Sequence, residues 1–246
     1  MSRKTKSSTP VSEARFTPPA LALAICRRID DMRESARLPR PEVILEPSAG
    51  CGSFVAAART IWPGAAIYAV EPLSQYREVL LATGADSVHV GALEDFGREI
   101  GPDLIIGNPP FTLAEAHVRL LRPMLPVTGT LAFLLRINFY GGRDRVSFWR
   151  EHQEDCMLPI APRPSFGKNE HGKKGTDGTE YATFVWGSLG PGVGGRCHRG
   201  PHIIPADGEV WGDAPDPLPA AAAIADPSTA DFFVEPTVSA SAVDFE

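Results

Sequence analysis

The 246-residue sequence predicts an α/β protein with a Rossmann-like, doubly wound and mostly parallel sheet. Two observations support this fold class. Short apolar runs alternate with helical stretches between about residues 42 and 137, and alternation of this kind indicates βαβ units. Two of the apolar runs also end in turns marked by glycine or proline. Because ligands of such sheets bind beyond the carboxyl ends of the strands, we look for a site in these turns.

Composition and cysteine usage limit the class of protein. A hydrophobic content of 43% is ordinary for a globular protein and allows a sizeable core. The four cysteines lie far apart without a C-x-x-C pair, so the sequence suggests neither a disulfide framework nor a metal site. No apolar run is long enough to span a membrane, and the charged N-terminus lacks the apolar segment of a signal peptide. We therefore expect a cytoplasmic protein without a membrane or metal partner.

The charge of the chain is unevenly distributed. Residues 188–246 hold nine acidic and two basic residues, whereas the formal net charge of the whole chain is −6, so the preceding part is near neutral. The 188–246 segment is rich in proline, alanine and glycine without periodicity, which predicts a mostly disordered acidic tail. Residues 1–12 are predicted to be a disordered basic arm. Residues 13–187 remain as the predicted catalytic domain.

The first predicted helix lies in "RFTPPALALAICRRIDDM". Thr17 is its expected cap, and the prolines that follow fall where a first helical turn tolerates them. Leu21, Ile25, Ile29 and Met32 are apolar at helical spacing, so one face of this helix should be buried.

The remaining elements follow from the same patterns. Helices are predicted at residues 73–82 and 113–121, and the second opens with Thr112-Leu-Ala-Glu115, the pattern of a capping box. The predicted strands are residues 43–45, 66–70, 88–90, 104–106, 131–137 and 181–186.

The stretch "VILEPSAGCGSFVAAA" predicts a strand, a tight turn with Gly50 and Gly52, and an alanine-rich helix. Glycines let the backbone approach a ligand at the positive end of the following helix. Glu46, at the end of the strand, would repel a pyrophosphate but suits a cationic ligand. Glu71 ends the next strand, 19 residues after Gly52, where an acid commonly holds ribose hydroxyls. Together the two carboxylates indicate a positively charged nucleoside, and S-adenosylmethionine is such a molecule.

The stretch "DLIIGNPPF" runs a short strand into Asn108, two prolines and Phe111. Proline fixes φ and restricts the preceding residue, so Asn108 is held at the abrupt end of the strand. The exocyclic amine of a nucleobase is a poor nucleophile, because its lone pair is delocalised into the ring. Acceptors from the Asn108 side chain and the Pro109 carbonyl would localise this pair, and Phe111 would stack on the base. No strong base is needed if the proton leaves after methyl transfer.

Residues 14–187 resemble the S-adenosylmethionine-dependent DNA N6-adenine methyltransferases that carry an N-P-P-F/Y motif. "FTPPALA" is similar to their N-terminal cofactor motif, "EPSAGCGSF" to their glycine motif, "AVEP" to their ribose-binding acid and "NPPF" to their catalytic motif, in the order of the gamma group. "APRPSF" followed by "TDGTEYATFVW" resembles small phage and prophage members. The resemblance implies a class I methyltransferase fold, DNA as partner, and methyl transfer to N6 of a flipped-out adenine.

The resemblance also implies roles for individual residues. Phe166 would be a second aromatic ring against the flipped base. The family usually has an acid after the third strand, where this chain has Ala92, and the alternatives are Asp95, Glu94 or a backbone carbonyl. The implied catalytic residues are Asn108, Pro109, Pro110 and Phe111, and the implied cofactor-binding residues are Thr17, Glu46, Ser48, Gly50, Gly52, Glu71 and Asp95.

Basic residues after the fifth strand are candidates for phosphate contacts, although nearby acids make a solvated surface an equal alternative for those between 143 and 150. The motif does not specify the substrate fully. N-P-P-F also occurs in rRNA base methyltransferases, and N-P-P-Y in enzymes that methylate a protein glutamine. The alternatives are therefore an RNA base methyltransferase and a catalytically silent cofactor- or nucleic-acid-binding protein. The predicted nucleic-acid contacts are Arg143, Arg145, Lys168, Lys173 and Lys174.

Overall fold

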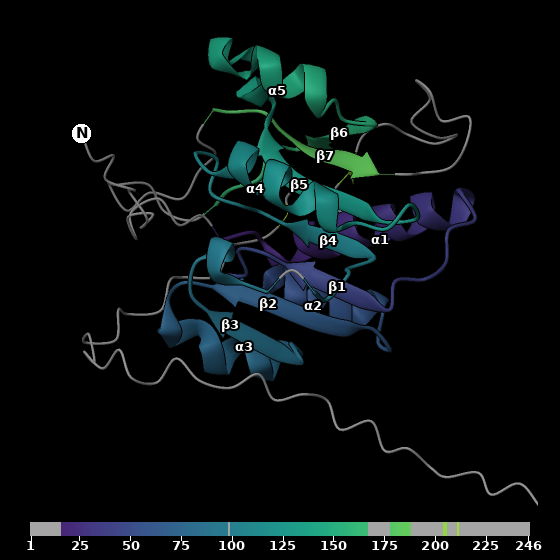
Figure 1. The fold of residues 1–246 in the computed structure, drawn as a ribbon, viewed down its shortest axis with the longest axis vertical. Coiled ribbons are helices and arrows are strands. Elements are labelled where there is room, and N and C mark those ends of the chain that lie inside the picture. The colour runs from purple at the N-terminus through teal and green to yellow at the C-terminus, as the bar shows by residue number, and fades with distance from the viewer. Residues whose placement is uncertain (1–15, 98, 167–177, 188–203, 206–210, 212–246) are drawn as a thin grey trace, which may run out of the picture.

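The computed structural model describes residues 16–97, 99–166, 178–187, 204–205 and 211. It contains an eight-stranded sheet in the order β3-β2-β1-β4-β5-β7-β6-β8, with helices on both faces (Figure 1). The strands are β1 (Val43–Glu46), β2 (Ala66–Glu71), β3 (Ser87–Val90), β4 (Leu104–Gly107), β5 (Thr130–Arg136), β6 (Cys156–Ala161), β7 (Tyr181–Gly187) and β8 (Ile204–Pro205). The α-helices are α1 (Pro19–Ser35), α2 (Ser53–Ile61), α3 (Arg77–Thr83), α4 (Ala114–Leu121) and α5 (Val146–Glu151).

The predicted fold class is confirmed by the strand order and directions. Strands β1 to β5 are parallel to one another, β7 runs antiparallel to both β5 and β6, and β8 pairs parallel with β6. The order reverses at β1, which pairs with β2 on one side and with β4 on the other. In an open sheet of this type, such a switch point is where ligands bind.

Two hydrophobic layers cover the sheet. Successive strand residues face opposite sides, so Ile44 packs in the layer of α1, α2 and α3, and Leu45 packs in the layer of α4 and α5. The four apolar residues predicted for one face of the first helix are at most 1% exposed, which confirms that prediction. Among the described residues, no helix is long and apolar enough to cross a membrane.

Both predicted helix caps are wrong. Helix α1 begins at Pro19 after Pro18, without a side-chain cap, and prolines have no N–H for Thr17 to accept. Helix α4 begins at Ala114, again without a side-chain cap. A turn in which the Leu113 N–H donates to the Pro110 carbonyl precedes α4, so Thr112 does not occupy the capping position.

Three elements were absent from the prediction. Helix α5 follows the basic stretch after β5, and β6 pairs with β7 although Pro159 lies within β6. The third is β8, which lies beyond the predicted domain boundary at residue 187 and pairs with β6; Trp211, also beyond this boundary, is buried. The predicted arm at 1–12 and residues 212–246 lie outside the described residues.

Arg33, near the end of α1, joins this helix to the beginning of β5. Its side chain is only 2% exposed, and its guanidinium donates to Thr130 Oγ1 at 2.7 Å. It also donates to the carbonyl oxygens of Pro39 at 2.8 Å and Thr128 at 3.2 Å. A buried charge held by several acceptors in this way fixes the helix against the sheet.

We predict that Arg33→Met lowers the free energy of unfolding by about 2–4 kcal/mol, because methionine leaves these buried acceptors without their donors. Chemical denaturation measures the change. Arg40→Met is the control, since Arg40 is 74% exposed and lies 3.7 Å from Asp30, and it should cost less than about 1 kcal/mol. Equal losses in both variants would contradict the assigned role of Arg33.

Candidate active site

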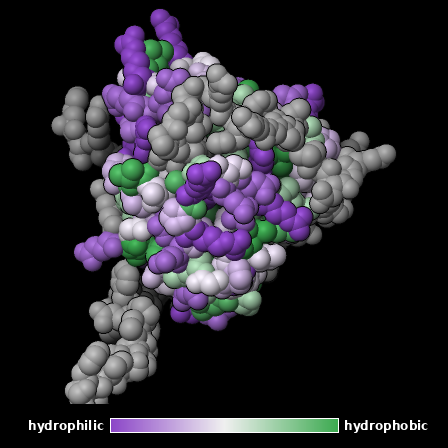
Figure 2. Space-filling model, turned by 90° about the vertical axis from the view of Figure 1, so that its right-hand side faces the viewer, coloured by the Kyte–Doolittle hydropathy of each residue, from purple (hydrophilic) through white to green (hydrophobic). Residues whose placement is uncertain are grey.

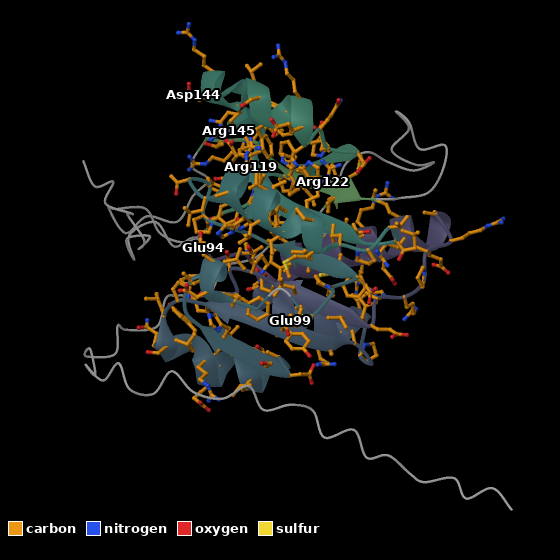
Figure 3. All side chains as sticks on the ribbon, viewed as in Figure 1. Glu94, Glu99, Arg119, Arg122, Asp144 and Arg145 are labelled. Carbon is orange, nitrogen blue, oxygen red and sulfur yellow. The ribbon has the colours of Figure 1, made fainter. Side chains whose placement is uncertain are left out.

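The glycine turn and the N-P-P-F turn meet at one edge of the sheet. Strands β1 and β4 are parallel neighbours, with Leu45 opposite Ile105, so the turns that follow them lie side by side. Figure 3 shows Glu94, which follows β3, and Asp144 and Arg145, which follow β5, toward the same side of the molecule. Arg122, which precedes β5, lies toward the other side. The predicted motifs are therefore brought together at the carboxyl edge.

The turn after β1 requires its glycines. Gly50 and Gly52 have φ values of 52° and 89°, in the left-handed region that glycine adopts most readily. A side chain at Gly52 would also collide with the hydroxyl of Thr83. The Gly50 N–H donates to Glu71 Oε2 at 2.8 Å, which ties the turn to the end of β2. The backbone thus passes tightly from β1 into α2, as the sequence predicted.

Two buried carboxylates flank this turn. Glu46 is 2% exposed, accepts from the Ser48 N–H at 3.0 Å, and fills the space where a side chain at Gly107 would lie. Burial raises the pKa of Glu46 to about 8; the Ser48 hydrogen bond opposes this shift and the charge of Glu71 adds to it. Burial also raises the pKa of Glu71, which is 7% exposed. A cationic ligand would favour the charged form of both groups.

Thr17 connects the N-P-P-F turn to the start of α2. Asn108 Nδ2 donates to Thr17 Oγ1 at 3.1 Å, and the Thr17 carbonyl accepts from Ser53 Oγ at 2.7 Å. Thr17 itself is 4% exposed. The "FTPP" stretch therefore lies between the two motifs, and the Thr17 hydroxyl that was predicted to cap a helix contacts the Asn108 amide instead.

Phe111, the last residue of the N-P-P-F turn, belongs to a cluster of aromatic rings. Phe111 packs against both hydrophobic layers, and its ring centroid is 6.0 Å from that of Tyr181. The ring centroid of Phe166 is 4.7 Å from that of Tyr181, so the two rings expected to hold a base contact the same tyrosine. The guanidinium of Arg136 lies 4.9 Å from the Phe111 ring centroid.

Sequence reasoning missed Arg136 and Tyr181. Arg136 ends β5, Tyr181 begins β7, and the two residues pair directly in the antiparallel ladder. Both strands were predicted, but their pairing was not. If β7 had been predicted as an antiparallel neighbour of β5, its first residue, Tyr181, would have been expected at the carboxyl edge of the sheet beside Arg136.

Four other residues singled out in the sequence lie near this edge of the sheet or in α4. Ser48 donates from Oγ to the Pro47 carbonyl at 2.8 Å, next to Glu46. Asp95 and Glu94 are exposed in the short 3₁₀ turn Leu93–Asp95 that begins after Ala92. His117, in α4, is 4% exposed, and burial lowers its pKa to about 4, which keeps it neutral.

Of the basic residues predicted to contact nucleic acid, Arg145 makes contacts within the protein and Arg143 is exposed. Arg145 donates to the Phe139 carbonyl at 3.2 Å, lies 3.8 Å from Glu115, and stacks 4.5 Å from the Phe139 ring centroid. These contacts give Arg145 a structural role that the sequence did not reveal. Arg143 is exposed, whereas Lys168, Lys173 and Lys174 lie outside the described residues.

The opposite edge of the sheet, at the amino ends of the parallel strands, has a mostly polar surface. Figure 2 shows this face, on which hydrophilic residues predominate and hydrophobic residues form small separate groups. No cluster of three or more potential metal ligands occurs within the described part of the chain.

Comparison with known proteins returned similar structures only. No protein-family model matches the chain, and no curated protein matches it. The precorrin-6y C5,15-methyltransferase from Geobacter metallireducens is 18% identical, with 65% of this chain and 87% of that chain covered and a TM-score of 0.43. The plantazolicin methyltransferase BpumL, in complex with SAH, is 13% identical, with 54% and 52% covered and a TM-score of 0.43.

TrmN from Thermus thermophilus is 22% identical, with 68% of this chain and 48% of that chain covered and a TM-score of 0.40. The chain thus spans about half the length of BpumL and of TrmN. At these TM-scores the similarities carry no argument about activity. The class that the strand order defines is an α/β protein with a Rossmann-like, mostly parallel sheet, and its site lies at the switch point.

We predict that Glu46 makes stability depend on pH. Its pKa is raised from its usual value of 4.5 to about 8, so its protonated form favours the folded state. The contribution of Glu46 to the free energy of unfolding should therefore be greatest below pH 4.5. It should fall by at most about 5 kcal/mol as the pH rises from 4.5 through 8. Denaturation across this pH range measures the slope.

Glu46→Gln should remove this part of the slope and stabilise the protein at pH 8. Glu78→Gln is the control, because the Glu78 side chain is 81% exposed, and its slope should match that of the unmodified protein. The assignment fails if Glu46→Gln leaves the pH dependence of stability unchanged.

Proposed function

We propose that this protein is a methyltransferase that moves a methyl group from S-adenosylmethionine to the exocyclic N6 amine of adenine in DNA, with the target base flipped out of the duplex. The observation that carries the proposal is the turn Asn108-Pro-Pro-Phe111 at the end of β4, beside the glycine turn and the buried carboxylates of β1 and β2. The choice of adenine in DNA as the substrate rests on the resemblance of these motifs to those of the N-P-P-F enzymes.

S-adenosylmethionine fits the chemistry of this edge. When bound, it supplies a methyl group on a positively charged sulfur. Glu46 and Glu71 are buried carboxyl groups with raised pKa values, and a nearby cation would stabilise the charged form of both. The Glu71 carboxylate accepts from the Gly50 and Leu73 N–H groups, which fix its orientation and leave further lone pairs for ribose hydroxyls.

Asn108 supplies an oriented acceptor for the substrate amine. Its Nδ2 donates to Thr17, so the amide oxygen of the same side chain lies on the other side of the amide group. With the Pro109 carbonyl, this oxygen accepts the two N–H bonds of the amine and localises its lone pair. The stiff Pro-Pro segment holds both acceptors before substrate arrives, so little reorganisation is needed during reaction.

The chemical step is then a direct transfer. The amine lone pair forms the new N–C bond as the C–S bond breaks, and the C–S electron pair returns to sulfur. The nitrogen becomes transiently cationic and loses its extra proton to solvent, which requires no strong base. Phe111 and Phe166 supply aromatic surface for the flipped base, which must lie outside the stack to be reached.

The test is methyl transfer from labelled S-adenosylmethionine to unmethylated duplex DNA and to rRNA in parallel, followed by nucleoside mass spectrometry. We expect N6-methyladenine in DNA. Label found only in RNA would indicate that the substrate is an RNA base. Cofactor binding without label in either nucleic acid would indicate a catalytically silent binding protein.

We predict that Asn108→Ala lowers kcat at least about 100-fold, the usual cost of removing one preorganised hydrogen-bonding group. Cofactor affinity, measured by calorimetry, should stay within about twofold, because Asn108 acts on the amine. Thr112→Ala is the control, since Thr112 is exposed just beyond Phe111 and should not affect kcat. Activity retained in Asn108→Ala would rule out this mechanism.

We predict that Thr17→Val lowers kcat about tenfold, because valine keeps the shape of threonine but cannot hold the Asn108 amide. Thr17→Ser keeps the hydroxyl and should restore most of the rate. Steady-state kinetics with each variant separates two roles: a change confined to KM for S-adenosylmethionine would mean that Thr17 contacts the cofactor and does not orient Asn108.

A further inference from the structure

A segment beyond the predicted domain packs against the loop that carries Phe166. Strand β8 pairs with the end of β6, with Ile204 opposite Ile160 and Pro205 opposite Ala161. Ile204 is 2% exposed, and β8 also lies against α1. Residues 204–205 therefore extend the sheet at the point where the 161–166 loop begins.

Trp211 makes a specific contact with this loop. Its indole Nε1 donates to the Pro162 carbonyl at 2.7 Å, and its side chain is 4% exposed. The ring belongs to the same hydrophobic layer as Ile160 and Tyr181. Trp211 thus combines a large apolar contact with one directed hydrogen bond, which fixes where the loop leaves the sheet.

The loop then has only a short path to Phe166. Pro164 is buried, and the Phe166 ring lies 4.7 Å from the ring of Tyr181. Tyr181 is 1% exposed and fixed by its pairing with Arg136, so it provides a rigid wall. With Pro162 anchored at one end and Tyr181 at the other, few positions remain for the Phe166 ring.

We propose that Trp211 is a positioning residue that holds the Phe166 ring ready to receive the flipped base. The inference rests on the proposed function, because it assigns Phe166 to the substrate. A loop that is ordered before substrate arrives does not lose conformational freedom on binding, so anchoring it strengthens substrate affinity. Trp211 itself does not touch the base.

Trp211→Phe in the full chain tests this role, because phenylalanine keeps most of the apolar contact and removes the hydrogen bond. We expect KM for duplex DNA to rise about tenfold, the factor that one hydrogen bond of ordinary strength supplies, with kcat and cofactor affinity little changed. Trp62→Phe is the matched control, since Trp62 is 2% exposed and donates from Nε1 to Asp30 at 2.8 Å, away from this loop. An equal rise of KM in both variants would overturn the assignment.

A second measurement does not depend on activity. Hydrogen exchange of a peptide covering residues 161–166, without substrate, should become faster in Trp211→Phe and stay unchanged in Trp62→Phe. Unchanged exchange would show that Trp211 does not hold the loop. Faster exchange with an unchanged KM for DNA would show that the loop does not serve substrate binding, whereas absence of methylation in the unmodified protein would reject the proposed function alone.

Discussion

The pairing of β1 with β4 is the contact on which the candidate site depends. Because the strand order reverses at β1, the turns after these two strands are neighbours in space although 50 residues and more separate them along the chain. Glu46 and Gly107 meet at this junction, and the bare glycine backbone leaves room for the buried carboxylate. The positions of the N-P-P-F turn and of the buried Glu46 side chain are therefore set by one strand pair.

The elements that were predictable from sequence are those in which local pattern and burial agree. Strands β1, β2, β4 and β5 are short, mostly apolar runs that are largely buried in the parallel part of the sheet, so their positions were found to within a residue or two. The glycine turn was predictable for a different reason, because the required φ values restrict the residue type. Asn108 and Phe111 were identified because proline restricts the backbone around them.

What was missed depends on contacts between distant parts of the chain. Nothing near Thr17 reveals that its hydroxyl faces Asn108, 91 residues away. Arg145 was predicted as a nucleic-acid contact, with a solvated surface as the alternative, but it contacts Phe139 and Glu115, which come from different elements. Strand β8 is two residues long within a stretch without periodicity, and only its pairing with β6 defines it.

The position of Trp211 has a consequence for synthesis of the protein. Strands β1 to β5 and both motifs precede residue 137, so they leave the ribosome before the segment that carries Trp211. The contact between Trp211 and Pro162 can form only when the chain has been extended by the 49 residues that follow Pro162. A nascent or prematurely terminated chain can thus contain both turns while the loop that carries Phe166 lacks its contact with Trp211.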